Sequence, residues 1–208
     1  MVNALVDADE AAARLPSGLR PHAVGGKTVV GCCLLELADI RPGGLPMPGV
    51  RMRAAAHRIA VELDGDVGVF VPGRLTDSRA ARAIGGRLYP GVHRPAAITV
   101  DHDGDRLAWS VDPASHDDPP VNVAVSFAAA AAADPREPVG ATCLAATIGV
   151  SPGHDGALEA VRMAPSHRCA ARVEIDALDS SFLASFTTAQ LAPAYLMRDV
   201  AVTWSVAA

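Results

Sequence analysis

Two Asp-Gly turns, each set between apolar and alternating segments, constrain the fold more than any other feature of this sequence. The turns are Asp64-Gly65-Asp66, between residues 51–63 and 67–71, and Asp103-Gly104, between residues 96–100 and 106–111. An Asp-Gly pair favours the tight turn of a β-hairpin because both residues tolerate a positive φ angle. The sequence therefore predicts two antiparallel hairpins.

The rest of the chain predicts more strands than helices. Further strands are expected at residues 27–37, 121–127, 141–150, 158–163, 169–178 and 200–206. Helices are expected at residues 7–15, from a cap at Thr76 or Asp77 to Ile84, and as a turn at residues 182–186. The alanine run at residues 128–133 fits a helix, a strand or a loop. This pattern predicts a mainly β (α+β) protein, an antiparallel β-barrel or sandwich with a few peripheral helices.

Composition limits the class of protein and its partners. The chain has 208 residues, of which 50% are hydrophobic and 20% charged, which suits one domain over residues 1–208. It contains no run of about 18 apolar residues that would span a membrane. Acidic residues follow the start at once, so no signal peptide is expected and the predicted location is cytoplasmic. A net charge of −5 and 4% aromatic residues argue against nucleic-acid binding.

No motif in the sequence predicts a metal or a cofactor. The cysteines are Cys32, Cys33, Cys143 and Cys169, without a C-x-x-C pair, so buried free thiols are expected rather than a zinc or redox site. The acidic segment 101–105 serves the second hairpin turn and lacks the spacing of a calcium loop. The sequence has no G-x-S-x-G elbow, Walker A loop or dinucleotide fingerprint, so hydrolase, NTPase and dehydrogenase functions have no support.

Three segments resemble the acetoacetate decarboxylase superfamily. They are residues 7–10 with Leu15-Pro16-Ser17-Gly18-Leu19, then Ala83-Ile84-Gly85-Gly86-Arg87-Leu88-Tyr89-Pro90, and the closing residues 178–180 with 195–200. The resemblance implies a closed, cone-like antiparallel β-barrel around a pocket, in a homo-oligomer. It also implies a small-molecule substrate or ligand.

The sequence departs from this family at the position of the catalytic amine. Decarboxylases of the family place a Schiff-base lysine just after the Tyr-Pro step, where this chain has Gly91-Val92-His93-Arg94. The family's acidic residue on the strand before the first hairpin falls near Ala54, and its early arginine has no clear counterpart. A Schiff base needs a primary amine, which arginine cannot supply. The only lysine, Lys27, is expected at an exposed strand edge, so imine-based decarboxylation is not supported.

The strand at residues 51–63 carries two candidate site residues on opposite faces. Alternation places His57 with Ala55, Ile59 and Val61 on an apolar face, so His57 is expected to point inward. Arg58 shares the other face with small alanines. The resemblance turns that second face toward the pocket, which makes Arg58 a candidate ligand-binding residue. The alternative is a solvated Arg58 on the outside of the barrel.

The helix at residues 76–84 and the loop after it supply the other candidates. Arg79, Arg82 and Arg87 lie close enough to hold a carboxylate or phosphate, or to form a solvated face paired with acids such as Asp77. Tyr89, His93 and Arg94 belong to the loop that carries chemistry in relatives. His93 is a candidate general acid or base, as is His57. We expect Arg58 and the loop at residues 89–94 to converge on one cavity.

Three functions fit these observations. The first is an enzyme acting on a small or medium carbonyl compound without a Schiff base, of lyase, cyclase or isomerase type, with secondary metabolism as one setting. Its arginines would stabilise an enolate or carboxylate while a histidine moves a proton. The second is a non-catalytic small-molecule-binding protein of the same fold. The third is an interaction domain whose cavity is filled by its own side chains.

Overall fold

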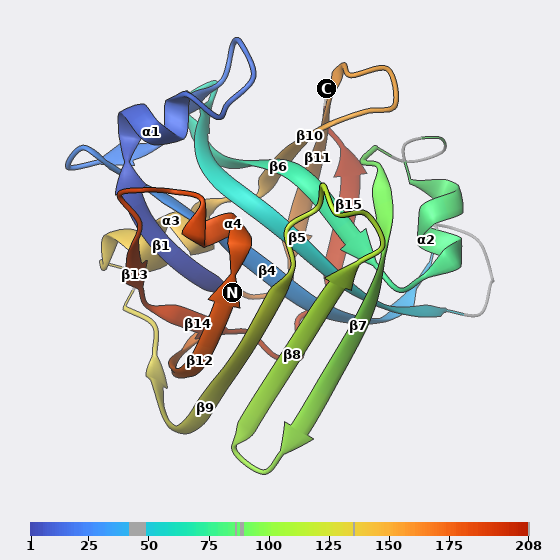
Figure 1. Ribbon diagram of the computed structural model, residues 1–208, viewed down its shortest axis with the longest axis vertical. Helices are drawn as coiled ribbons and strands as arrows, with labels where there is room; N and C mark the ends of the chain where they lie inside the picture. Colours follow the sequence, from blue (N-terminus) through green and yellow to red (C-terminus); the bar gives the residue numbers. More distant parts are fainter. Residues whose placement is uncertain (42–48, 86, 88–89, 135, 208) are drawn as a thin grey trace.

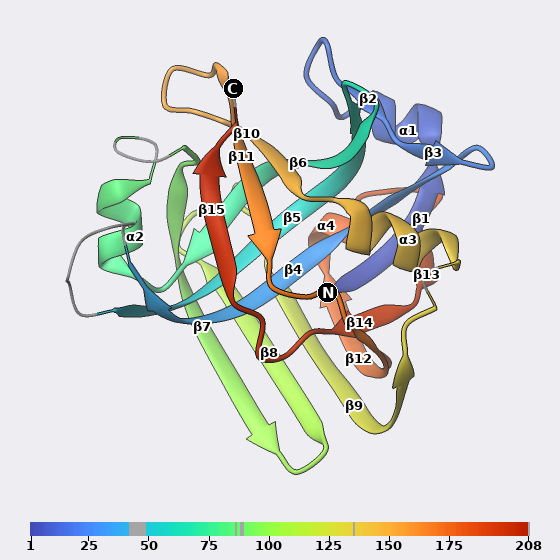
Figure 2. The same cartoon turned by 180° about the vertical axis from the view of Figure 1, so that it is seen from behind.

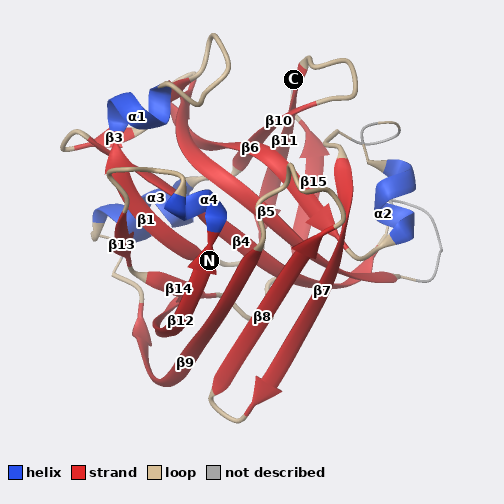
Figure 3. Cartoon of the chain, in the orientation of Figure 1, coloured by secondary structure: helices blue, strands red, loops and turns tan. Residues whose placement is uncertain are grey.

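The computed structural model describes residues 1–41, 49–85, 87, 90–134 and 136–207, and it is mostly β (Figures 1 and 3). Among the described residues the helices are α1 Ala8–Ala12, α2 Arg79–Ile84, α3 Pro138–Ala145 and α4 Ser181–Ala184. The strands are β1 Val2–Asp7, β2 Arg20–Pro21, β3 Ala23–Val24, β4 Lys27–Ile40, β5 Val50–Leu63, β6 Asp66–Thr76, β7 His93–Asp103, β8 Arg106–Pro113, β9 Val121–Ala132, β10 Ile148–Pro152, β11 Leu158–Pro165, β12 Ala171–Ser180, β13 Gln190–Ala192, β14 Ala194–Leu196 and β15 Val202–Val206.

One large mixed sheet contains all of these strands. Its main path runs β13-β1-β4-β5-β6-β7-β8-β9-β12-β14, and β10, β11 and β15 branch from it through β6. The prediction of a purely antiparallel sheet is wrong, because β6 pairs in parallel with both β7 and β10. Parallel neighbours need a crossover between them, and α2 forms part of the connection from β6 to β7. In the view of Figure 2, β11 and β15 cross in front of β4 and β5.

The sheet curves until its two ends approach each other, but the strand ladder does not close. The Met1 nitrogen donates to the Tyr195 carbonyl oxygen at 2.7 Å, and the Tyr195 N–H donates to the Met1 carbonyl oxygen at 2.9 Å. These two hydrogen bonds form a seam between β1 and β14. Strand pairing does not continue across it, so the expected closed barrel is not confirmed.

Both predicted hairpins are confirmed. Leu63 pairs with Asp66 at the first turn and Asp103 pairs with Arg106 at the second. Asp64 has a φ angle of 50° and Gly65 one of 90°, so the turn uses the conformational freedom that the Asp-Gly pair supplies. Strands also cover the predicted segments at residues 27–37 and 158–163, and the described backbone of the alanine run to Ala132 is strand.

Two local predictions need correction, and one strand near the start of the chain was missed. The segment at residues 141–150 is not one strand, because α3 occupies Pro138–Ala145 before β10 begins. Proline at the first position of a helix has the φ angle that the helix needs, which favours α3 here. Helix α2 is capped by Ser78, whose hydroxyl accepts from the Ala81 N–H, rather than by Thr76 or Asp77. Strand β1 was not predicted.

The two faces of β5 pack into different apolar clusters. Ala55, Ile59 and Val61 belong to the main core, which lies inside the curve of the sheet. Ala60 packs on the other side, in a smaller cluster that includes Cys143 of α3. The predicted alternation along this strand is therefore confirmed, and the burial of the main cluster is the chief apolar contribution to stability.

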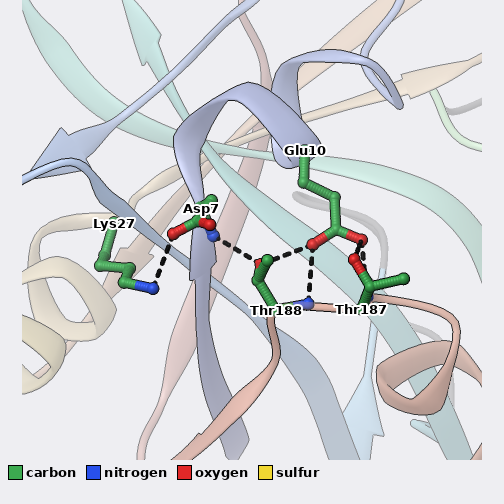
Figure 4. A network of polar contacts seen from close by, with 5 residues as sticks. All are labelled: Asp7, Glu10, Lys27, Thr187 and Thr188. Carbon is green, nitrogen blue, oxygen red and sulfur yellow. Dashed lines mark hydrogen bonds and ion pairs between the residues drawn. The ribbon is translucent and has the colours of Figure 1, made fainter.

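The only lysine lies at the α1 end of the sheet, in a network of polar contacts (Figure 4). Lys27 Nζ lies 2.6 Å from Asp7 Oδ1, and the Asp7 N–H donates to Thr188 Oγ1 at 2.9 Å. Glu10 accepts four hydrogen bonds, from the N–H and hydroxyl groups of Thr187 and Thr188. These hydrogen bonds lower the pKa of Glu10 to about 2. Lys27 is thus an ion-paired residue of this network.

The edge of β6 divides at a point that we call the fork, residues 71–73. Before it, Gly68–Phe70 pairs with β10, and after it, Arg74–Thr76 pairs with β7. Proline at the middle of the fork lacks the N–H that a ladder would use. Side chains from β7 and β10 can therefore meet at this gap. No helix in the described part of the chain is long and apolar enough to cross a membrane.

Candidate functional site

The fork opens into a cavity of about 240 Å³ that we call the fork cleft. It is lined by Val71, Pro72, Gly73, Arg74, Val92, Arg94, Ser151, Pro152, Gly153 and His154. Strands β6, β7 and β10, the loop before β7 and the segment after β10 contribute to it. Two of the lining side chains are guanidinium groups, which makes the cleft a candidate site for an anion.

Arg94 enters the fork from β7. Its Nη2 atom lies 2.6 Å from Oδ1 of Asp118, a side chain that is only 3% exposed, whereas Arg94 itself is 41% exposed. The same Nη2 atom lies 3.4 Å from the Pro72 carbonyl oxygen. A Cβ atom on Gly73 would overlap this guanidinium, so a side chain there would force Arg94 to move. Arg94 is thus fixed on one side and open to the cleft on the other.

Arg74 reaches the cleft from β6. Its Nη2 atom donates to Ser151 Oγ of β10 at 3.2 Å. Its Nε atom lies against Gly91, which has a φ angle of 99° and could not take a side chain without strain. The Gly91 N–H donates to Glu159 Oε2 of β11 at 2.6 Å. The loop before β7 is therefore held between Arg74 and Glu159.

His93 lies beside Arg74, because the two residues are paired in the parallel register of β6 and β7. Its Nδ1 atom lies 3.1 Å from the Gly91 carbonyl oxygen. A carbonyl oxygen only accepts, so Nδ1 carries the hydrogen and Nε2 is the basic nitrogen of the neutral ring. Burial lowers the pKa of His93, and the positive charge of Arg74 lowers it further. His93 is therefore a neutral base near pH 7, although it is not among the described residues that line the cleft.

His57 points into the main core, as its apolar face predicted. Its side chain is 1% exposed, and its ring centre lies 4.7 Å from that of Phe182. The Nε2 atom lies 3.0 Å from the Pro119 carbonyl oxygen, and Nδ1 has no hydrogen-bond partner among the described residues. Burial lowers the pKa of His57. It lies on the face of β5 opposite to Arg58, so the strand does not bring these two candidates together.

Arg58 is buried rather than solvated, with 5% of its surface exposed. Its Nη2 atom donates to Asn3 Oδ1 at 2.5 Å and to Cys143 Sγ at 3.1 Å, beneath α3. Asn3 in turn donates to the Pro193 carbonyl oxygen at 2.7 Å. Arg58 shares its face of the sheet with Arg74, but it is not among the described residues that line the fork cleft. Its expected convergence with the loop at residues 89–94 stays a prediction.

The three arginines of the α2 region do not line the fork cleft. Arg79 and Arg87 are exposed, and Arg82 is half-buried. Arg87 Nη1 lies 3.4 Å from the Ala83 carbonyl oxygen. Asp77, an expected ion-pair partner, instead accepts from the backbone N–H of Arg53 at 2.9 Å. Tyr89 lies outside the described residues.

Four further polar residues shape the cleft and were not predicted. They are Arg74, Asp118, Ser151 and Glu159. Arg74 was hidden in a run assigned to no element, and Asp118 belongs to a polar loop with several acids. Gly73, which precedes Arg74 in the sequence, is the only local signal near that arginine. Among the described residues, no group of three or more His, Cys, Asp or Glu side chains could hold a metal ion.

Comparison with known proteins identifies the fold. No family model matches the sequence, and no curated protein matches it significantly. The acetoacetate decarboxylase from Legionella pneumophila subsp. pneumophila str. Philadelphia 1 superposes with a TM-score of 0.63 at 13% identity, over 93% of this chain and 77% of that chain. The enduracididine biosynthesis enzyme MppR, complexed with pyruvate, gives a TM-score of 0.60 at 13% identity, over 99% of this chain and 86% of that chain.

A third structure agrees with these two. An acetoacetate decarboxylase-like enzyme from Sphingomonas wittichii RW1 gives a TM-score of 0.57 at 13% identity, over 99% of this chain and 86% of that chain. At such low identity the similarity concerns the fold alone. The chain therefore has the mostly β fold shared by acetoacetate decarboxylase and its structural relatives, as the resemblance implied.

Proposed function

We propose that the protein is an enzyme that acts on a small 2-oxo acid in the fork cleft, without a Schiff base. The observation that carries this proposal is the convergence of Arg74 and Arg94 on one cleft, beside the neutral His93. Guanidinium groups bind carboxylates through charge-assisted hydrogen bonds. MppR, which has the same fold, has been crystallised with pyruvate, a molecule of this class.

The proposed reaction starts with removal of a proton next to the carbonyl group. Arg74 and Arg94 would hold the carboxylate, and Nε2 of His93 would accept a proton from the adjacent carbon. The electron pair of the broken C–H bond moves to the carbonyl oxygen, giving an enolate that the guanidinium groups stabilise. Lyase, cyclase and isomerase reactions can all proceed from such an enolate. Lys27 has no part in this reaction, because it is ion-paired in the network at α1.

A non-catalytic binding protein is the second candidate function. It is favoured by the position of His93, which is not among the described residues that line the cleft. Such a protein would hold the 2-oxo acid between the two arginines and release it unchanged.

We further propose that residues 1–208 act as one domain and form a cytoplasmic homo-oligomer. The partner would be a small molecule rather than nucleic acid or a membrane, and the reaction would need no cofactor. The net charge of −5 supports the exclusion of a nucleic-acid partner, and the lack of a nucleotide-binding motif supports the exclusion of a nucleotide cofactor.

Proton exchange on pyruvate distinguishes the two functions. The experiment follows the methyl signal of pyruvate by NMR in D₂O with wild type, His93→Gln, the double variant Arg74→Gln/Arg94→Gln, and the exposed control Arg51→Gln. We expect wild type and Arg51→Gln to accelerate exchange, His93→Gln to bind pyruvate without exchange, and the double variant to lose binding.

Each other outcome has a definite meaning. Binding by wild type without exchange would establish the binding-protein function instead. No binding by wild type would contradict both candidates. Reduction with borohydride in the presence of pyruvate should leave Lys27 unmodified, and an adduct there would contradict the mechanism.

A further inference from the structure

A second and larger cavity lies inside the curve of the sheet, and we call it the core cavity. Its volume is about 490 Å³, within the usual range for small-molecule sites. Its lining residues come from β1, β4, β8, β9, β12 and β14, with others from the β7–β8 hairpin and the segment after β14. The apolar walls are formed chiefly by Leu34, Leu107, Trp109, Val123, Val125 and Val173.

The core cavity is separate from the fork cleft. No described residue lines both of them. Leu34 lies on the face of β4 that packs into the main core, whereas Arg74 pairs with Ala56, on the opposite face of β5 from His57. An apolar space of this size weakens the core unless something occupies it, because the wall atoms lack contacts on one side.

The charged side chains that line the core cavity are exposed and mark its mouth. Arg198 lies over the ring of Phe127, with its guanidinium carbon 4.2 Å from the ring centre. Glu36 is already engaged by His102 at 2.8 Å and by Arg53 at 3.4 Å. Asp199 also lines the mouth. No carboxylate of the described residues forms an ion pair with Arg198, so its charge remains open to a ligand.

We propose that the core cavity binds a medium-chain carboxylic acid, with the chain between the apolar walls and the carboxylate at Arg198. The walls provide the area that an aliphatic chain buries. The guanidinium, which is held over Phe127, provides a charge-assisted hydrogen bond for the head group. This site is independent of the proposed reaction in the fork cleft.

Tryptophan fluorescence gives a direct test. Trp109 is 6% exposed and lines the cavity, whereas the other tryptophan, Trp204, lies on β15. In a Trp204→Phe background, Trp109 alone reports on binding. The probes are decanoate, decanol and decyltrimethylammonium, titrated at pH 8 below their aggregation concentrations. We expect decanoate to bind best and to change the Trp109 emission.

Two variants test where the carboxylate and the aliphatic chain of the ligand bind. Arg198→Gln should weaken decanoate binding by about tenfold and leave decanol binding unchanged, as loss of one charge-assisted hydrogen bond predicts. The exposed control Arg51→Gln should change neither. Leu34→Trp should abolish binding of both probes because the larger ring fills the cavity. If Leu34→Trp does not fold, the Arg198 comparison still decides the proposal.

Several results would overturn the proposal. Decanoate and decanol that leave the Trp109 emission unchanged would show that the cavity takes no such ligand. Stronger binding of decyltrimethylammonium would assign the mouth to a cation. A Trp109 emission that changes with protein concentration, together with dimerisation in sedimentation, would show that a second copy of the chain covers the mouth.

Discussion

The fork cleft and the core cavity lie in the same sheet, yet their linings are opposite in character. The fork cleft presents two guanidinium groups and the Ser151 hydroxyl where the β6 ladder is interrupted. The core cavity presents aliphatic and indole walls, with its charged side chains at the exposed mouth. The first arises from a gap in backbone pairing, and the second from side chains that do not fill the core. One sheet can therefore offer a polar and an apolar site without placing either chemistry near the other.

The largest effect is expected in the wall of the core cavity. Trp109→Ala should lower the free energy of unfolding by about 3–5 kcal/mol, because it removes a buried aromatic side chain. Val92→Ala in the fork cleft should cost less than about 1 kcal/mol, since Val92 is half-buried in a loop. Urea unfolding followed by circular dichroism measures both. Equal losses would show that the two linings do not differ in their contribution to the core.

The next effect concerns the base of the fork cleft. His93→Gln should slow pyruvate proton exchange by about a hundredfold or more, the usual contribution of a positioned general base. The pKa of His93 is lowered, so its neutral form persists below the ordinary value of 6.5. The wild-type rate should therefore fall on acidification with its midpoint below pH 6.5. A midpoint above pH 6.5 would contradict this assignment.

A smaller effect is expected at Asp118, where one substitution should lower stability and strengthen ligand binding in the fork cleft. Asp118→Asn removes the buried partner of Arg94 and should lower the free energy of unfolding by about 1–2 kcal/mol, reduced because Arg94 is partly exposed. The same change should strengthen pyruvate binding, because it removes a negative charge beside the anion site. Urea unfolding measures the expected loss of stability, and calorimetric titration measures the expected gain in pyruvate affinity. Asp117→Asn, at the exposed neighbouring residue, is the control and should change neither.

The smallest effect is expected in the network at α1, whose residues line neither the fork cleft nor the core cavity. The pKa of Glu10 is lowered to about 2, so its contribution to stability is complete above pH 4.5 and is lost as the pH falls toward 2. Glu10→Gln should therefore reduce the difference between the urea midpoints at pH 6 and pH 3. Ligand binding at pH 7 should not change in the fork cleft or in the core cavity. An unchanged midpoint difference would show that Glu10 does not contribute to acid sensitivity.

The elements that could be predicted are those whose conformation depends on residues close together in the sequence. The hairpins follow from turn chemistry that acts over a few residues, at Asp64-Gly65 and Asp103-Gly104. Strand β1 was missed because its partners, β4 and β13, include a segment almost 190 positions away. Helix α3 was missed because a short apolar run fits a buried helix as well as a strand. Pro138, at the start of α3, was the available signal.

The candidate site divides in the same way. His93 and Arg94 were predicted because the resemblance pointed to their loop. Arg74 could not be predicted, because its contact with that loop depends on the parallel pairing of β6 with β7, and the connection between these strands includes α2. Asp118 and Asp117 look alike in the sequence, and only tertiary packing buries the first and exposes the second.

The seam between Met1 and Tyr195 has a consequence for the order of folding. It joins residues 194 positions apart, so nearly the whole chain must be synthesised before it can form. Contacts of such separation carry a large entropic cost and form late. The core cavity is bordered by both partners of the seam. A nascent chain still lacking β14 therefore has an incomplete cavity, and any ligand held there can bind only after the C-terminal strands leave the ribosome.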